Sequence, residues 1–350
     1  MKLTGINFSD TSIEAVELEQ GWLQGPAFSA FSRVLLPDGC IENGVILKPE
    51  IVVEQLRQLL AQAKPKAITT TAITLSLPEG QIFSRLLSFP KSSTQDQIEQ
   101  TIIDQLSRFL PFEPGEVFFD TLPLGQRGDK VDVLLVAVQK TVVQGYEAIA
   151  QQLGWTVKAI ELESISSARA VLDKIPARQA ILLLDIGART TIASWFDSSG
   201  LRYSYNIALA GNYFTEQVVK QLRCTPLEAE QRKQAEGFTG AMAPILTEAF
   251  SPILKQVREG LAYVQANYDL PTTAVHLLGG SARLPGLADF LTQQLHIETS
   301  LVQLLPKLKK NDILQQIQEE DSIYYNAVGL ALGSSKAYQQ RPTINFYRKH

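Results

Sequence analysis

The chain has 350 residues, more than one hydrophobic core usually supports, so we expect at least two domains. Hydrophobic residues make up 45% and charged residues 19% of the chain, as is typical of a globular protein. The formal net charge of −4 lacks the basic excess of nucleic-acid-binding proteins and excludes that class.

The two cysteines, Cys40 and Cys224, lie far apart and have no Cys or His neighbours at metal-binding spacing. This excludes a disulfide framework and a zinc site, and it fits a reducing compartment. The first ten residues contain no apolar stretch of a signal peptide, and no apolar run approaches the ~20 residues that span a bilayer. We therefore expect a cytoplasmic protein that reaches a membrane only through partners.

The chain opens with two predicted strands. Residues 3–25 alternate apolar and polar side chains around the polar turn Asn7–Ser12. Residues 48–63 place apolar side chains at helical spacing and predict an amphipathic helix, whereas residues 72–78 predict a buried strand.

The next stretch, residues 75–157, predicts a compact α/β insertion. Thr94 and Gln97 have the spacing of a helix capping box, and an apolar helical face follows them. Residues 116–139 predict two strands around a polar turn, and residues 142–154 predict a second helix.

The second half repeats the opening pattern of strand, polar turn and strand. Residues 181–196 begin with a continuous apolar run, typical of a buried strand, and the turn Asp185–Thr191 follows it. Further helices are predicted at 212–222, 225–238, 251–268 and 321–334, and a strand, glycine turn and helix at 273–296.

These turns are candidate parts of a nucleotide site, although the common phosphate-binding fingerprints are absent. Backbone N–H groups of two hairpin turns would bind phosphates, and Asp185 would hold the waters of a Mg²⁺ ion. Gly279 and Gly280 would let the backbone approach a flat base closely. The alternatives remain that Asp185 is a strand-end turn residue and that the two glycines form a plain turn.

Six segments, in chain order, carry a resemblance to the actin-like ATPase superfamily and, within it, to the PilM family of type IV pilus assembly proteins. They are "LSLPEGQIFSRLLSFP", "FLPFEPGEVFFD", "LLLDIGARTT", "EAEQRK", "LLGGSARLPGL" and "AVGLALG". The resemblance implies an α/β, actin-like (ribonuclease H-like) two-domain fold with a small α/β insertion subdomain in the first domain, as in the cell-division protein FtsA.

The domain boundaries follow from this resemblance. The first domain would comprise residues 1–74, 158–180 and 322–340, with the insertion at 75–157. The second domain would span residues 181–321 with a helical part at 225–270, and residues 341–350 would form a tail.

The resemblance also implies which residues bind ATP and Mg²⁺. The cofactor-binding residues would come from two phosphate loops, a helix that contacts ribose and adenine, and a glycine turn against the base, with Asp185 directing the metal. They are Asn7, Ser9, Asp10, Asp185, Gly187, Thr190, Gly211, Glu228, Lys233, Gly279, Gly280 and Ser281. For Glu228 and Lys233, solvated helix residues are an equal alternative.

The first phosphate loop departs from the family's pattern. Asn7 replaces a metal-directing aspartate, Ser9 replaces a glycine, and Glu14 replaces a lysine. A neutral amide adds no charge for Mg²⁺, and a glutamate would repel phosphate. Asp10 is a possible substitute carboxylate if the turn is remodelled. We expect weak nucleotide binding, no catalytic residue and impaired or absent phosphoryl transfer.

The resemblance implies a binding function in type IV pilus assembly and twitching motility. The chain would lie at the inner face of the inner membrane and bind the N-terminal cytoplasmic tail of PilN, whose motif resembles I-N-L-L-P. Other pilus components and a homo-oligomer are further possible partners. An extended peptide needs an apolar groove with free backbone edges, and the resemblance places this groove between the first domain and its insertion. The candidate side chains are Leu75, Leu77, Ile82, Ile98 and Ile102.

Two alternative functions and the role of one C-terminal segment remain to be considered. An active ATPase or kinase would need a general base, for which Glu161 and Glu163 are candidates. An FtsA-like polymerising protein would need an amphipathic C-terminal helix, which Pro342 disfavours. Thr343–Tyr347, "TINFY", resembles the partner motif and would fold back, or dock on a neighbouring copy, to occupy the same groove; a frayed polar terminus is the alternative.

Overall fold

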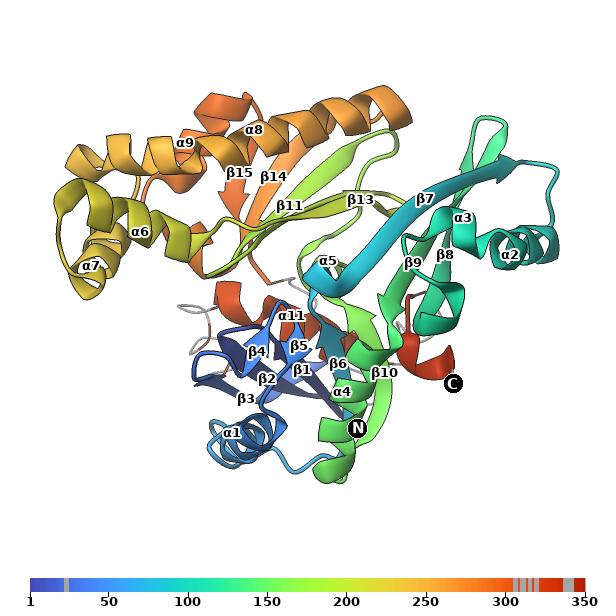
Figure 1. Ribbon diagram of the computed structural model, residues 1–350, viewed down its shortest axis with the longest axis horizontal. Coiled ribbons are helices and arrows are strands. Elements are labelled where there is room, and N and C mark those ends of the chain that lie inside the picture. Colours follow the sequence, from blue (N-terminus) through green and yellow to red (C-terminus); the bar gives the residue numbers. More distant parts are fainter. Residues whose placement is uncertain are drawn as a thin grey trace. The chain divides into compact units, whose positions relative to one another are not determined.

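The computed structural model describes residues 1–21, 25–304, 308, 313, 317, 321–335 and 343–349. Two compact units make up the chain (Figure 1): unit 1 is Met1–Leu172 with Leu304–His350, and unit 2 is Asp173–Gln303. Unit 2 thus ends shortly after Leu301, the last residue of its sheet. Residues 336–342 and 350, parts of the expected first domain and tail, lie outside the described residues.

Unit 1 is built on a five-stranded sheet with the strand order β10-β6-β1-β2-β3. The strands β1, β2 and β3 form an antiparallel meander, and β6 and β10 are added in parallel to β1. Their bounds are β1 (Lys2–Phe8), β2 (Ser12–Glu19), β3 (Ala27–Leu35), β6 (Ala72–Leu77) and β10 (Thr156–Leu162).

Helices cover both faces of this sheet, which is why β1 is buried at every position after Lys2. Figure 1 shows α1 and α4 on one side and α5 and α11 on the other. A short hairpin of β4 (Ile41–Glu42) and β5 (Val45–Ile46) precedes α1. The helices are α1 (Pro49–Ala61), α4 (Lys140–Gln152), α5 (Glu163–Val171) and α11 (Asp321–Gly333).

Two glycines let α11 lie close to its neighbours. A Cβ at Gly5 of β1 would collide with the backbone of α11, and a Cβ at Gly329 of α11 would collide with the Ser166 carbonyl of α5. The segment "AVGLALG" thus has a packing reason for its small residues.

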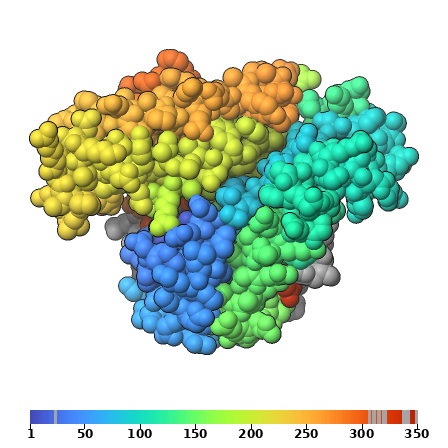
Figure 2. Space-filling model, in the orientation of Figure 1, coloured from blue at the N-terminus to red at the C-terminus, as the bar shows by residue number. Residues whose placement is uncertain are grey.

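The insertion between β6 and β10 has a sheet of its own, in the order β7-β9-β8. Thr94 and Gln97 form the expected capping box at the start of α2. Figure 2 shows the compact cyan and green surface of this insertion. Its elements are η1 (Glu79–Gln81), β7 (Ile82–Pro90), α2 (Gln95–Asp104), α3 (Leu106–Phe109), η2 (Pro114–Glu116), β8 (Val117–Arg127) and β9 (Lys130–Gln139).

Unit 2 repeats the sheet topology of unit 1. Its strand order, β13-β12-β11-β14-β15, has the same antiparallel meander followed by two parallel strands. The elements are β11 (Ala180–Ile186), β12 (Thr191–Asp197), β13 (Gly200–Ile207), α6 (Gly211–Leu222), α7 (Pro226–Glu236), η3 (Gly240–Met242), α8 (Ala243–Tyr268), β14 (Thr272–Leu278), η4 (Gly280–Arg283), α9 (Leu287–Leu295) and β15 (Glu298–Leu301).

Candidate functional site

The turn after β11 is the best-formed part of the candidate site in unit 2. Asp185 lies near the end of β11 and pairs with Leu278 of the parallel strand β14, so the carboxyl ends of the two strands meet. Gly279 follows β14 with a φ of +85°, and a Cβ there would collide with the Asp185 carboxylate. Only glycine fits at this position.

The start of α6 completes this group. The Gly211 N–H donates to the carbonyl of Gly187 (3.1 Å), and the Ser281 hydroxyl donates to the same carbonyl (3.0 Å). A Cβ at Gly211 would collide with the Ser281 hydroxyl. Thr190 closes the turn by accepting the Gly187 N–H (3.0 Å). Unit 2 therefore brings its expected phosphate-turn and base-turn residues together, and the exposed Gly280 lies beside them.

The two expected ribose and adenine contacts on α7 have other partners. Glu228 is exposed and forms the capping box of α7 with Thr225. Lys233 is 3% exposed, and its ammonium donates to the Gly211 carbonyl (3.0 Å) and the Thr215 hydroxyl (2.9 Å). Burial lowers the pKa of Lys233, against the opposing effect of the Glu230 carboxylate at 2.6 Å. Lys233 thus supports the first turn of α6.

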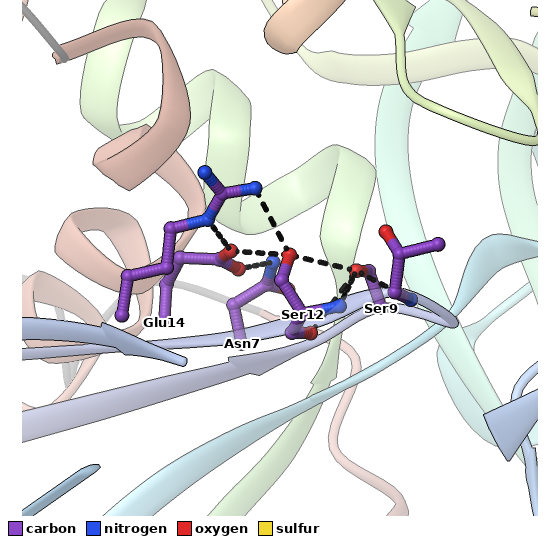
Figure 3. Close-up of polar contacts among 6 residues, drawn as sticks. Asn7, Ser9, Ser12 and Glu14 are labelled. Atoms are coloured by element: carbon purple, nitrogen blue, oxygen red, sulfur yellow. Dashed lines mark hydrogen bonds and ion pairs between the residues drawn. The ribbon is translucent and has the colours of Figure 1, made fainter. Parts of the chain in front are cut away.

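The first phosphate turn in unit 1 is closed by its own side chains (Figure 3). The Ser9 hydroxyl accepts the N–H groups of Ser12 (3.0 Å) and Thr11 (3.3 Å), and the Ser9 N–H donates to the Ser12 carbonyl (2.9 Å). Phe8 donates its N–H to the hydroxyl of Ser76. The N–H groups of Phe8, Ser9, Thr11 and Ser12 therefore already have acceptors within unit 1.

A buried carboxylate lies beside this turn. Glu14 is 3% exposed, and its oxygens accept hydrogen bonds from Asn7 Nδ2 (3.1 Å), the Ser12 hydroxyl (2.6 Å) and Arg33 Nε (3.0 Å). Figure 3 shows Asn7, Ser12 and Glu14 pointing toward one another. Burial raises the pKa of Glu14, although Ser12 and Arg33 oppose this effect. The hydrogen-bond donors of this cluster are paired with the Glu14 carboxylate, which is its one acidic group.

The Asp10 carboxylate binds a neighbouring backbone turn. Its two carboxylate oxygens accept the N–H groups of Asn43 and Gly44, both at 2.9 Å, and so fix the turn between β4 and β5. The remodelled turn that would aim Asp10 at a metal is therefore not the turn observed.

The two halves thus differ in how well they fit ATP and Mg²⁺. The glycine turns of unit 2 leave backbone close to Asp185, as a nucleotide site requires. The turn of unit 1 presents the buried carboxylate of Glu14, and it does not fit a Mg²⁺–triphosphate. Among the described residues, no group of three His, Cys, Asp or Glu side chains could hold a metal ion.

The expected partner-binding side chains are mostly core residues. Leu75 and Leu77 are 1% and 0% exposed in β6. Ile98 and Ile102 of α2 lie in the core of the insertion with Leu135. Their apolar periodicity is accounted for by this packing, so these four side chains do not line an open groove. Ile82, at the start of β7, is half-buried.

The carboxylates considered as a general base are held in structural contacts. Glu161 is paired with Arg169 at 2.7 Å, and both side chains are buried. Glu163 accepts the Glu79 N–H (3.1 Å), while the Glu79 carboxylate accepts the Ser164 hydroxyl (2.8 Å). This reciprocal pair ties the start of η1 to the start of α5.

Comparison with known proteins decides the family. The model of the type IV pilus assembly protein PilM matches residues 5–335. The chain belongs to the PilM family. The cell division protein FtsA of Streptococcus pneumoniae serotype 2 is 21% identical over 85% of this chain and 74% of its own length.

Solved structures show the fold of this PilM-family chain. The PilM–PilN type IV pilus biogenesis complex matches with a TM-score of 0.79 and 22% identity, over 94% of this chain and 97% of the other. MreB5 of Spiroplasma citri bound to AMPPNP matches with a TM-score of 0.56 and 15% identity, over 97% of each chain. The expected α/β actin-like fold is therefore confirmed.

Two structural contacts of this PilM-family chain escaped the sequence interpretation. The partner of Glu14, Arg33, lies directly opposite it in the β2–β3 register, which sequence spacing alone does not fix. Asp120 of β8 accepts the backbone N–H of Asn345, a contact between residues 225 positions apart.

Among the described helices, none is long and apolar enough to cross a membrane.

Proposed function

We propose that this chain is a scaffold of the type IV pilus assembly platform that binds the N-terminal tail of PilN. Its PilM-family membership supports this function, and so does its likeness in fold to a PilM–PilN complex. Through PilN the scaffold is held at the inner face of the inner membrane, where it serves pilus assembly and twitching motility.

The single observation that favours a scaffold over an ATPase is the closed first turn. Phosphoryl transfer depends on positioning and on neutralising the charge of the phosphates. Glu14 adds a carboxylate at this turn, and the Ser9 hydroxyl closes the turn by accepting the N–H groups of Thr11 and Ser12. The glycine turns of unit 2 support weak binding of a nucleotide without turnover. Any bound nucleotide then has a structural role.

Calorimetry on the full chain tests both parts of the proposal. A synthetic peptide with the N-terminal sequence of PilN is expected to bind, whereas ATP with Mg²⁺ binds weakly and releases no phosphate above background. Peptide titrations without heat at several temperatures would reject the scaffold. Steady phosphate release would instead establish the enzyme.

A variant of the first turn sharpens the test. Asn7→Asp restores the carboxylate typical of the family but places it against Glu14, where two negative charges repel. We therefore expect Asn7→Asp alone to leave phosphate release at background and to lower the free energy of unfolding by about 2 kcal/mol. Increased phosphate release in this variant would show that the aspartate alone had been missing.

A further inference from the structure

The segment Thr343–Tyr347 lies against the edges of two sheets in unit 1. Figure 1 shows the short turn η5 (Phe346–Lys349) beside β10, and residues of η5 also contact β8. β10 is the outer strand of the five-stranded sheet, and β8 is an outer strand of the insertion sheet. We name the site that the segment occupies against these two strands the β8–β10 groove. Strand edges of this kind can bind a peptide.

Three consecutive side chains of the segment are buried in this groove. Ile344 and Phe346 are each 0% exposed, and Asn345 between them is 3% exposed. Residues 343–345 belong to no helix or strand. A short segment that buries two large apolar side chains and an amide, and that continues into η5, is bound in the manner of a peptide ligand.

Asn345 makes the contacts that give the groove its selectivity. Its backbone N–H donates to Asp120 Oδ2 of β8 at 2.9 Å, and its side-chain Oδ1 accepts the Ile160 N–H of β10 at 3.1 Å. The same Oδ1 accepts the Tyr347 N–H at 3.0 Å, which bends the segment into η5. An aspartate side chain would place a buried charge at this position, and an apolar one would leave the Ile160 N–H without its partner.

A buried arginine holds the start of the segment. Arg169 Nη2 donates to the Thr343 hydroxyl at 3.3 Å, while its Nη1 donates to Glu161 Oε2 (2.7 Å) and the Gly329 carbonyl (2.8 Å). The segment is thus connected to β10, α5 and α11 by one guanidinium group.

We propose that the β8–β10 groove is a recognition site for an extended partner peptide with an asparagine between two large apolar residues, and that Thr343–Tyr347 is its resident intrachain ligand. The partner peptide enters only when this segment leaves. The identification of the partner with the PilN tail rests on the function proposed above; the groove and its occupant rest on the contacts of Asn345.

This arrangement predicts competition. A tethered ligand acts at a high effective concentration, so it reduces the apparent affinity for a free peptide by the fraction of time that the groove is filled. Weakening the tether without damaging the groove should therefore increase the affinity for added peptide.

The test uses the full chain and two fluorescent peptides, one with the sequence of residues 341–347 and one with the N-terminal sequence of PilN. Asn345→Ala removes the contacts to Ile160 and Tyr347 but keeps the apolar side chains of the segment. Fluorescence anisotropy should show both peptides binding this variant at least about tenfold more tightly than the unaltered chain. Asn206→Ala, at an exposed position of β13 in unit 2, is the matched control and should change neither affinity.

Two further experiments test whether the groove recognises the asparagine of the peptide. The added peptides with alanine in place of their asparagine should bind Asn345→Ala at least about tenfold more weakly, because the Ile160 N–H stays unpaired. The double variant Asp120→Ala/Asn345→Ala should lose the increased affinity for the added peptides that Asn345→Ala alone shows. Circular dichroism checks that the double variant is folded. If it does not fold, the alanine peptides alone decide the question.

The outcomes separate the two proposals. If PilN peptide binds the unaltered chain and Asn345→Ala equally, and the 341–347 peptide binds neither, the groove proposal is overturned and the scaffold function stands. If the 341–347 peptide gains affinity and the PilN peptide binds neither chain, the groove stands and the PilN function falls. A dimer in light scattering that is lost in Asn345→Ala would overturn the intrachain assignment, because the segment would then occupy a second copy.

Discussion

The two hairpin turns of this protein occupy the same place in two sheets of the same topology, yet their interiors differ. The Asn7–Ser12 turn of unit 1 is filled by its own hydroxyl and carboxylate groups. In unit 2, Gly211 and Gly279 lie close to the turn after Asp185, and this close approach leaves no room for a Cβ atom at either glycine. The topology of a sheet therefore does not dictate the chemistry of its turns.

The difference shows what keeps each turn in place. In unit 1, hydrogen bonds and an ion pair replace whatever ligand a phosphate turn would bind, so the turn is complete by itself. In unit 2, the backbone of Gly279 lies close to the Asp185 carboxylate, and the backbone of Gly211 lies close to the Ser281 hydroxyl. The first turn should therefore be sensitive to the loss of polar groups, and the second to the addition of atoms.

The largest effect is expected from adding one methyl group in unit 2. Gly279→Ala places a Cβ against the Asp185 carboxylate at a φ of +85°, and we expect a loss of about 3 kcal/mol of local stability. Hydrogen exchange of the β11 and β14 amides should then accelerate about 100-fold. Peptide-resolved mass spectrometry measures this acceleration.

The matched control for this change is its neighbour. A Cβ at Gly280 would meet no atom within 4 Å, so Gly280→Ala should leave the exchange of β11 and β14 nearly unchanged. Equal effects of the two substitutions would mean that the close approach at Gly279 does not limit this turn.

A smaller effect is expected from removing the buried carboxylate in unit 1. Glu14→Ala leaves the Asn7 amide, the Ser12 hydroxyl and the Arg33 guanidinium without their acceptor. Because Arg33 is partly exposed, we expect a loss of about 2 kcal/mol, seen as faster exchange in β1 and β2. The exposed Glu19→Ala in the same strand is the control, and a comparable loss there would refute the special role of Glu14.

The smallest expected effect is a change, with pH, in the contribution of Glu14 to the free energy of unfolding. Burial raises the pKa of Glu14 above its ordinary value of 4.5, so the folded chain binds this proton more tightly than the unfolded chain. The stability that Glu14 contributes through its proton is full below pH 4.5 and is lost as the pH rises through the raised pKa.

Glu14→Gln removes this titration and provides the measurement. The free energy of unfolding of the unaltered chain, minus that of Glu14→Gln, should fall as the pH rises from 4.5 toward neutrality. Urea titrations at several pH values give this difference. A constant or rising difference would show that the side chain is not desolvated in solution.

Much of the architecture could be predicted from local patterns. The apolar run before Asp185 forms β11, and the capping residues Thr94 and Thr225 begin α2 and α7, as expected. These features depend on neighbours within a few positions, so spacing is enough to predict them. The departure of the first turn from its family was also visible, because Asn7 and Glu14 can be read directly in the sequence.

The rest depends on contacts that sequence spacing does not encode. The apolar faces of Ile98 and Leu75 predicted burial, but the pattern cannot say whether a core or a partner covers them, and in this fold a core does. The likeness of Thr343–Tyr347 to a partner motif left open whether this segment docks or forms a frayed terminus. Its contact with Asp120 follows only from the folded arrangement of β8 and β10.

The close packing of α11 has a consequence for the order of folding during synthesis. Residues 321–333 leave the ribosome after all of unit 2, yet they cover β1 through the glycine contact at Gly5. Unit 2 can therefore fold while this face of β1 is still uncovered, and unit 1 cannot complete its packing until α11 has been synthesised. A nascent chain stalled before residue 321 should accordingly expose this apolar face to chaperones, whereas one stalled after residue 350 and clear of the exit tunnel should not.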